Sequence, residues 1–134
     1  MANFTRVPTR VRPLDGSWVR QEQMGGSGEA GEWVYTAADS DVEVADGSAL
    51  ATADAWGMIL PSHDKSTFVA GDMVEVCWLG RVAAFSDGTP GARGYVSDDA
   101  GETADAMGTV DKCMGYFESA EIFVILPGLA PLTS

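Results

Sequence analysis

The sequence predicts a mostly β domain of barrel or sandwich type. Short runs rich in β-branched and aromatic residues recur about every 8–12 residues, and glycine or aspartate separates them. The chain has 16 glycines among 134 residues, and no window of about 12 residues shows the 3.6-residue period of an amphipathic helix. A chain of this length is the size of one ordinary domain and can bury a core without disulfide bonds.

The predicted strands follow from the pattern of each run. Residues 73–79 alternate between polar and apolar side chains and then become continuously apolar, which is typical of a half-buried strand that enters a core. Gly80 interrupts this run, so residues 81–85 are expected to form a hairpin with it. Residues 122–126 are apolar on both faces, which predicts a central strand. Further strands are expected at residues 32–36, 56–60, 93–96 and 113–117, and the best helix candidate, one or two turns at most, is residues 101–107.

The first 31 residues differ from the rest in composition and charge. Pro8, Pro13 and the glycine-rich residues 24–31 disfavour regular structure. They predict an extended N-terminal arm and a flexible joint over residues 1–31, followed by a β-rich core domain over residues 32–134. Residues 1–20 carry a net charge of +3, whereas residues 21–134 carry −15. Within the arm, residues 4–7 and 17–20 are expected to form strands only if a partner supplies the pairing.

This charge asymmetry favours an arm that binds an acidic protein surface, such as that of a neighbouring copy. The expected partner-binding residues are Phe4, Arg6, Arg10, Arg12, Trp18 and Arg20. On this hypothesis, deletion of residues 1–20 leaves a folded domain that no longer stays on its partner.

Charge and hydropathy also argue against two classes of partner. The acidic body of the chain repels phosphate backbones, so we expect no nucleic acid. No stretch of about 18 apolar residues is present, so we expect no membrane span. No continuous apolar run follows the N-terminal arginines, so a cleaved secretion signal is not expected either.

Catalytic patterns are weak, and the sequence does not predict an enzyme. His63 is the only histidine, next to Asp64, and a catalytic triad there would need Ser62 or Ser66 as nucleophile. Neighbouring side chains on one loop diverge, and no glycine pattern of a nucleophile elbow surrounds either serine. The phosphate-binding pattern GxxxxGK[ST] is missing as well.

The acidic clusters do not predict a metal site or a cofactor. Residues 39–43 begin like a calcium-binding loop, but an EF-hand frame would place Val44 and Leu50 where glycine and glutamate are required. Asp98, Asp99 and Glu102 could hold a cation at an exposed turn, but solvated turn carboxylates are the favoured interpretation.

Cysteines and tryptophans have a structural interpretation. Cys77 and Cys113 stand in apolar runs without CxxC spacing, which favours buried free thiols and leaves a disulfide open. Trp56 and Trp78 stand in predicted strands, so core packing is favoured over a carbohydrate-binding platform.

Two segments resemble a known family. Residues 69–76 (Val-Ala-Gly-Asp-Met-Val-Glu-Val) and 79–82 (Leu-Gly-Arg-Val) resemble the aGD-x-V-x-V…G-x-V strand pair of small capsid decoration proteins. Residues 98–101 (Asp-Asp-Ala-Gly), Gly108 and the run from 113 to 126 resemble the later D-x-x-G…G-x-A and closing-strand segments of the same proteins. These are the head cement proteins of tailed bacteriophages.

The resemblance implies both a fold and a function. The expected fold is a small β-barrel or β-tulip-like domain with an extended N-terminal arm. The expected function is a structural virion protein on the outer capsid surface, without an active site, that cements neighbouring major capsid subunits as a trimer. The alternatives are another virion β-barrel protein at a head fibre or tail, a carbohydrate-binding module, and a small enzyme that uses His63.

Overall fold

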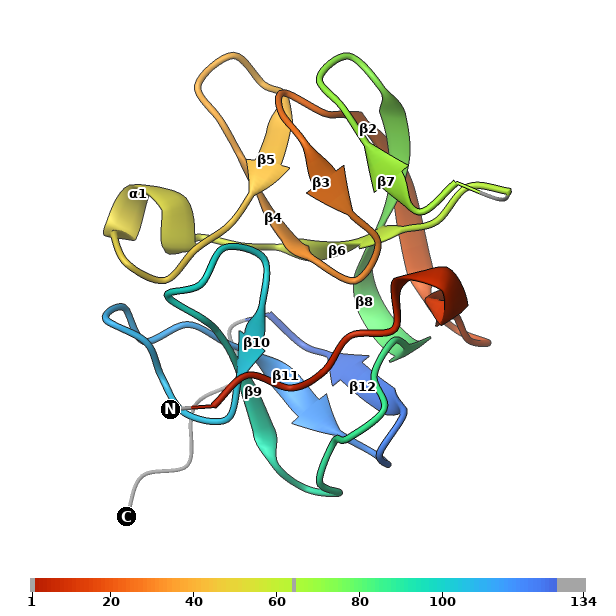
Figure 1. Cartoon of the computed structure of the whole chain (residues 1–134), viewed down its shortest axis with the longest axis vertical. Coiled ribbons are helices and arrows are strands. Elements are labelled where there is room, and N and C mark those ends of the chain that lie inside the picture. The colour runs from red at the N-terminus through yellow and green to blue at the C-terminus, as the bar shows by residue number, and fades with distance from the viewer. Residues whose placement is uncertain (1, 64, 128–134) are drawn as a thin grey trace.

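The computed structural model describes residues 2–63 and 65–127, and its mostly β architecture confirms the predicted fold class (Figure 1). The elements are the 3-10 helix η1 (Pro8–Arg10), β1 (Arg12–Pro13), β2 (Trp18–Gln23), β3 (Gly28–Glu29), β4 (Trp33–Thr36), β5 (Val42–Val44), α1 (Leu50–Ala53), β6 (Gly57–Leu60), β7 (Thr67–Phe68), β8 (Met73–Ala83), β9 (Arg93–Val96), β10 (Thr103–Ala104), β11 (Cys113–Phe117) and β12 (Ile122–Ile125). The expected strands near residues 32–36, 56–60, 93–96 and 113–117 are therefore present.

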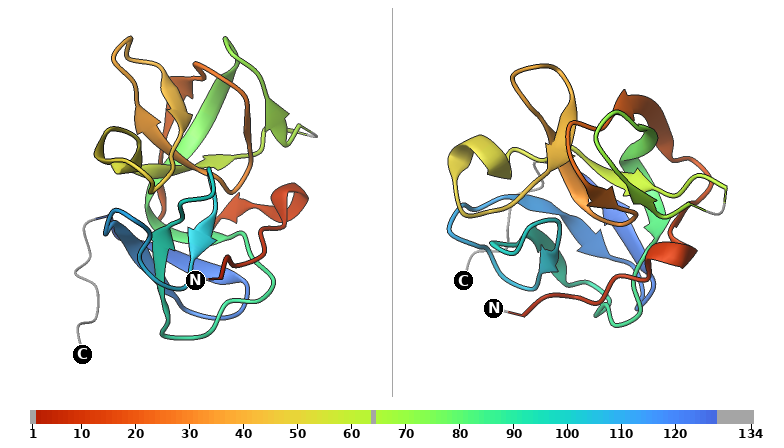
Figure 2. Two further views of the ribbon diagram at one scale, coloured as in Figure 1. Left: turned by 60° about the vertical axis from the view of Figure 1, so that its left-hand side comes forward. Right: turned by 45° about the horizontal axis from the view of Figure 1, so that its top comes forward.

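One strongly curled antiparallel sheet forms a half-barrel. Its strand order is β10-β9-β11-β12-β8-β6-β4-β5, and β1 and β2 also pair with β8, while β3 and β7 form a small separate sheet. The domain is divided into two lobes, and β8 passes from one to the other (Figures 1 and 2). The upper lobe consists of β2 to β7 and the first half of β8. The lower lobe consists of β1, the second half of β8, and β9 to β12. β12 lies between β11 and β8, as its apolar sequence predicts.

β8 is one continuous strand, so the predicted hairpin at Gly80 is wrong. Residues 73–79 pair with β2 and β6, and residues 80–83 pair with β12. Gly80 has φ +107°, and a Cβ there would lie 2.8 Å from the Cα of Ser17. Other residues rarely adopt this backbone conformation, so glycine at this position lets the strand bend between the lobes. The absence of a Cβ also lets the segment at Ser17 pack closely against β8.

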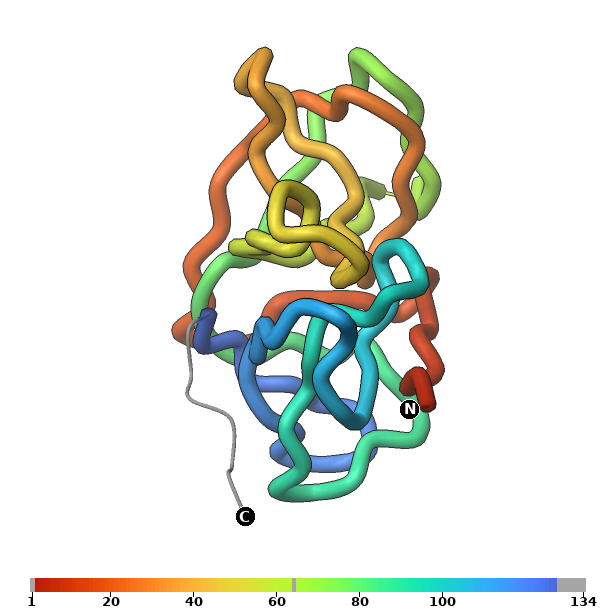
Figure 3. The backbone as a smooth tube through the Cα atoms, turned by 90° about the vertical axis from the view of Figure 1, so that its left-hand side faces the viewer, coloured from red at the N-terminus to blue at the C-terminus, as the bar shows by residue number. Residues whose placement is uncertain are grey.

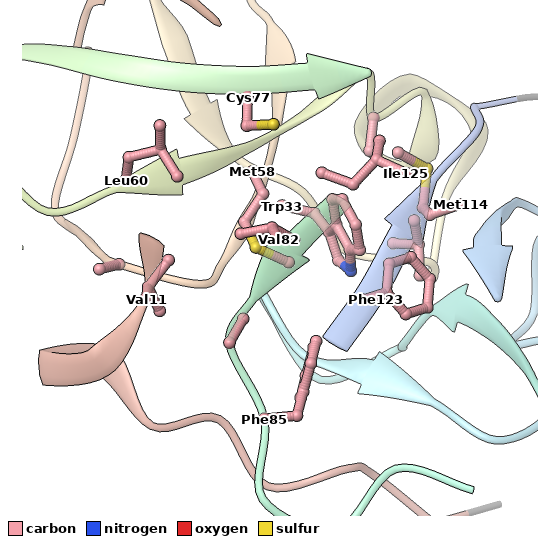
Figure 4. Close-up of a cluster of buried hydrophobic side chains, with 14 of the residues drawn as sticks. Val11, Trp33, Met58, Leu60, Cys77, Val82, Phe85, Met114, Phe123 and Ile125 are labelled. Atoms are coloured by element: carbon pink, nitrogen blue, oxygen red, sulfur yellow. The ribbon is translucent and has the colours of Figure 1, made fainter. Parts of the chain in front are cut away.

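The two lobes share a hydrophobic core. Trp33, Phe117 and Phe123 are fully buried in its main cluster, which reaches from the lower lobe into the junction of the lobes (Figure 4). The Trp33 indole N–H donates a hydrogen bond of 2.7 Å to the Thr103 hydroxyl, which satisfies the one polar atom of this large side chain. A second cluster around Ile59 and other buried side chains fills the upper lobe.

The N-terminal residues are part of this domain and differ from the predicted separate arm. β2 pairs with β8 in the upper lobe, and β1 pairs with β8 in the lower lobe. Isolated bridges join Asn3 to Ala104 and Arg6 to Phe85, so the segment runs from the lower lobe to the upper lobe (Figure 3). Deletion of residues 1–20 would therefore remove sheet pairing, contrary to the expectation from sequence.

The glycine-rich residues 24–31 also differ from the predicted flexible joint. Met24 is completely buried, and its amide N–H donates a hydrogen bond to the Asp72 carbonyl. A Cβ at Gly28 would lie 2.7 Å from the Met24 side chain and 2.9 Å from the Ile59 side chain. Gly28 therefore packs closely against the ends of two core side chains, which a larger residue would displace.

The helix predicted at residues 101–107 is wrong as well. This stretch contains β10 and turns, and Gly101 has φ +78°. The Gly101 amide donates to the Ala45 carbonyl and the Gly101 carbonyl accepts from the Trp33 amide, so long-range bonds replace helical ones. Among the described residues, no helix has the length and apolar character to cross a membrane.

Candidate functional site

The structure divides the six predicted partner-binding residues into two groups. Phe4 and Arg6 point into the domain, whereas the other four are exposed. Phe4 packs against Phe117 with ring centroids 4.4 Å apart, and Arg6 lies in a cluster of carboxylates. Both residues therefore stabilise the chain's own fold, and their binding to a partner stays a prediction.

Arg6 makes the densest ionic contacts of the described residues. Its guanidinium donates two hydrogen bonds to the Glu102 carboxylate, at 3.1 and 2.9 Å, and one of 2.9 Å to Glu29. A Glu32 oxygen lies 3.6 Å away. Burial lowers the pKa of Arg6, but the hydrogen bonds to Glu102 and Glu29 outweigh it and raise the pKa, so the guanidinium is always charged. This ion cluster holds the N-terminal segment against both lobes.

Glu32 gives the ion cluster a pH dependence. Burial raises the pKa of Glu32, and the nearby Arg6 opposes this only in part. A carboxyl whose pKa is higher in the folded state than in the unfolded state stabilises the fold when the pH is below its ordinary pKa of about 4.5. This stabilisation is lost as the pH rises through the pKa of the folded state. The ionised Glu32 is therefore a cost at neutral pH.

We expect Glu32→Gln to raise the free energy of unfolding at about pH 7 and to change it little at about pH 4. Glutamine keeps an oxygen that accepts the hydrogen bond from the Glu29 amide. Urea denaturation at both pH values measures the difference, with Glu121→Gln, at an exposed glutamate, as the control. A variant that is less stable than the parent at neutral pH would contradict this account.

Arg10 and Arg12 are exposed beside a small hollow of about 190 Å³. The hollow is also lined by Phe85, Ser86 and Glu121. Their binding to a partner stays a prediction, with which their exposure is compatible.

Trp18 and Arg20 belong to an exposed aromatic surface that continues beyond β2. We call Trp18, Arg20, Trp56 and Trp78 the tryptophan surface. The Trp18 and Trp78 rings meet edge to face with centroids 5.3 Å apart, and Trp18 is 59% exposed. The Arg20 guanidinium carbon lies 4.1 Å from the Trp56 ring centroid, and Arg20 also pairs with Glu22 at 2.8 Å.

A groove of about 430 Å³ runs through this surface. Its lining is mainly apolar and consists of Arg20, Thr36, Trp56, Trp78, Leu79 and Pro127. The Trp56 indole N–H donates a hydrogen bond of 3.0 Å to the Thr36 hydroxyl, which fixes the ring. A second hollow of about 430 Å³ shares Thr36, Trp56 and Pro127 with the groove, and Leu50, which is 80% exposed, is in its wall.

The prediction that Trp56 and Trp78 are core residues is thus wrong for Trp78 and holds only in part for Trp56, which packs against the core cluster of the upper lobe without being fully buried. Each is half-buried and lines the groove, whereas Trp33 is buried. Trp56 precedes β6, and Trp78 lies near the bend of β8, where the neighbouring strands do not cover its ring. The apolar sequence around them gives no signal of this exposure.

The candidate catalytic and cation-binding residues are dispersed or engaged elsewhere. His63 is exposed in a loop with φ +49°, and Asp64 lies outside the described residues. Asp98 accepts two hydrogen bonds from Thr109, and Asp99 accepts one from Asn3. Across residues 2–63 and 65–127, no group of three or more histidine, cysteine or acidic side chains is arranged to hold a metal ion.

Cys77 and Cys113 are free and buried, which settles the question that the sequence leaves open. Burial raises the pKa of both thiols, so they are protonated at neutral pH.

Comparison with protein-family models finds no match to this chain, and comparison with curated proteins finds none either.

Proposed function

We propose that this chain is a structural protein of a tailed-phage virion, which binds the outer capsid surface and cements neighbouring major capsid subunits without catalysing a reaction. The resemblance of residues 69–126 to decoration proteins supports the choice of partner. The same resemblance supports assembly as a trimer. The tryptophan surface supports the mode of binding.

The observation that carries the proposal is an exposed aromatic face on a highly acidic domain. The chain has a net charge of −12, yet Trp56 and Trp78 line an apolar groove, and the exposed Trp18 ring packs against Trp78 beside it. Tryptophan and arginine are the residues most enriched at the energetic centres of protein interfaces. A large apolar face on a small protein generally marks a binding surface.

Pre-organisation makes this surface suitable for tight binding. The contact of Trp18 with Trp78, and that of Arg20 with Trp56, order these side chains before a partner arrives. Less conformational entropy is then lost on binding. On a capsid lattice, many modest contacts of this kind act together.

We expect Trp18→Ala to raise the dissociation constant for purified capsids about thirtyfold or more, because truncation of an aromatic anchor costs about 2 kcal/mol or more. The measurement is quantitative electrophoresis of capsids after sedimentation with increasing amounts of protein. Met107→Ala is the control, since Met107 is equally exposed at 59% but lies outside the groove. Full occupancy with Trp18→Ala and with Trp78→Ala would overturn the proposal.

A carbohydrate-binding module is the second candidate, and the partial exposure of Trp56 and Trp78 favours it. Indole rings beside a hydroxyl such as that of Thr36 form a surface on which a sugar ring could stack. Titration with glycans, followed by tryptophan emission, separates the two candidates. A saturable shift in emission that Trp56→Ala abolishes supports the carbohydrate alternative.

A further inference from the structure

We infer that the hollow beside Arg10 and Arg12 in the lower lobe binds the acidic tip of the β4–β5 hairpin of a neighbouring copy of this chain. We call residues 37–43 the acidic hairpin tip. The two surfaces differ, so the copies join head to tail, and such a contact gives a closed ring when its rotation closes. The inference rests on the trimer of the proposed function and names the contact between its subunits.

Charge is distributed unevenly between the two lobes. Residues 17–79, which form the upper lobe, carry two basic and eleven acidic side chains, a net charge of −9. The rest of the chain carries six basic and nine acidic side chains, a net charge of −3. An acidic surface of a second copy therefore meets the least repulsion at the lower lobe, where the arginines are concentrated.

The hollow beside Arg10 and Arg12 offers positive charge that the chain itself does not neutralise. Both arginines are exposed, and no carboxylate of residues 2–63 and 65–127 lies within ion-pair distance of either guanidinium. Glu121 also lines the hollow, so its three charged lining residues leave an excess of one positive charge. A volume of about 190 Å³ holds several water molecules, which an entering acidic side chain can displace.

The acidic hairpin tip carries the complementary charge on a defined turn. Asp39, Asp41 and Glu43 form no ion pair with a basic side chain of the described part of the chain. The Ala37 amide donates to the Asp41 carbonyl at 2.8 Å, and the Ser40 amide donates to the Ala37 carbonyl at 3.0 Å. The Asp41 amide donates to the Asp39 carboxylate at 3.1 Å. These bonds fix the turn before binding, so less conformational entropy is lost when the contact forms.

Tyr35 of β4 responds to the same negative charge. Burial raises the pKa of Tyr35, and the nearby carboxylates of Glu43, Asp46 and Asp39 raise it further. The acidic side of this hairpin is thus uncompensated within its own copy. A positively charged surface on another copy is the contact that would lower its electrostatic cost.

The hairpin tip and the hollow lie in different parts of the molecule. The connection between β4 and β5 is at the outer end of the upper lobe, whereas η1, which ends at Arg10, lies beside the lower lobe (Figure 1). The hairpin of one copy therefore reaches the hollow of another copy and not its own. Each copy has one hollow and one hairpin tip, so a closed ring of three occupies all of them and growth stops.

Charge exchange tests the contact in solution. Native mass spectrometry should find the parent protein at three times 14.1 kDa, in equilibrium with smaller species. Arg12→Glu and Asp41→Arg, each alone, should raise the dissociation constant about tenfold or more, because each places like charges opposite each other. The double variant Arg12→Glu/Asp41→Arg should restore the trimer. Asp111→Arg is the matched control for Asp41→Arg, since it makes the same charge change at an exposed residue outside the hollow.

Salt provides a second readout of the same contact. Sedimentation velocity should show weaker association in about 1 M salt than in about 0.1 M salt, because the screening length falls from about 10 Å to about 3 Å. Circular dichroism checks that each variant is folded.

Cross-linking tests the head-to-tail arrangement. Ser86→Cys places a thiol in the lining of the hollow, and Ala38→Cys places one on the acidic hairpin tip, where both parent residues are exposed. A short bifunctional maleimide should link the two variants when they are mixed and should link neither variant to itself. The native cysteines are both buried and do not compete.

Self-linking of either variant as efficient as linking in the mixture would overturn the inference, as would a double variant that does not recover. A parent protein that stays monomeric at every accessible concentration would overturn it too, and so would a trimer that neither single charge reversal weakens. Capsid binding would survive each of these results, because its own test depends on Trp18 and Trp78. Loss of capsid binding would in turn leave the association of the isolated protein unchanged.

Discussion

Replacement of Arg6 by methionine is expected to lower the free energy of unfolding by about 2–3 kcal/mol, because it leaves three half-buried carboxylates without their counter-ion. The Arg6 guanidinium contacts Glu29, Glu32 and Glu102 and is only 11% exposed. Methionine fills a similar volume, so the loss is electrostatic more than steric. Urea denaturation followed by tryptophan fluorescence measures the change.

Two further variants make the Arg6 result specific. Arg10→Met removes an exposed arginine of the same segment and should change stability by less than about 0.5 kcal/mol. Arg6→Lys keeps the charge but loses the two-point contact with Glu102, so its stability should lie between those of the parent and Arg6→Met. Equal effects of Arg6→Met and Arg10→Met would mean that the ion cluster does not hold the segment in place.

Replacement of Phe117 by alanine should also cost about 3–5 kcal/mol, since it opens a cavity in the shared core. The Phe117 ring meets Phe4, Phe85 and Phe123 at centroid distances of 4.4, 5.1 and 4.9 Å. A Cβ at Gly88 would lie 2.1 Å from this ring, so the backbone already packs closely against it. The loss should therefore include contacts from the N-terminal segment, Phe85 just after β8, the loop at Gly88, and β12.

Tyr116→Ala is the matched control for Phe117→Ala. Tyr116 is the preceding residue of β11 and is half-buried, so its truncation should cost about 1 kcal/mol. The midpoint and slope of denaturation should both be measured, because a changed slope would indicate an altered unfolded state. Similar losses for both variants would contradict the central position of Phe117 in the core.

Much of the fold follows from the sequence because strand periodicity is a local property. β4, β6, β9, β11 and β12 all lie where alternating or continuous apolar runs predict them. The path of β8 through Gly80 could not be predicted in this way. A glycine between two apolar runs has the same local signature in a hairpin and in a bent strand, and only the packing of Ser17 against Gly80 distinguishes them.

The N-terminal segment shows a second limit of local reasoning. Prolines, glycines and basic charge predict an arm, and they do not reveal that β8 offers a pairing edge more than 50 positions later in the chain. The sequence predicts that Arg6 binds a partner, because the carboxylates that it contacts in the structure belong to residues far apart in the sequence, namely Glu29, Glu32 and Glu102. They converge only in the folded chain.

The candidate site was predictable in part. Trp18 and Arg20 stand in a polar, glycine-flanked context, and the structure places both at the surface. Trp56 and Trp78 were not predicted to be exposed, because the coverage of a ring depends on which strands lie beside it. The groove they line is a property of strand arrangement and not of any continuous motif.

The route of the N-terminal segment has a consequence for biosynthesis. Residues 3–23 leave the ribosome before the strands and bridges that receive them, which extend from residue 73 to residue 104. The nascent chain must therefore carry these residues unpaired until their partners have been made. Because distant contacts of this kind slow folding, we expect the closure of both lobes by this segment to be a late step of folding.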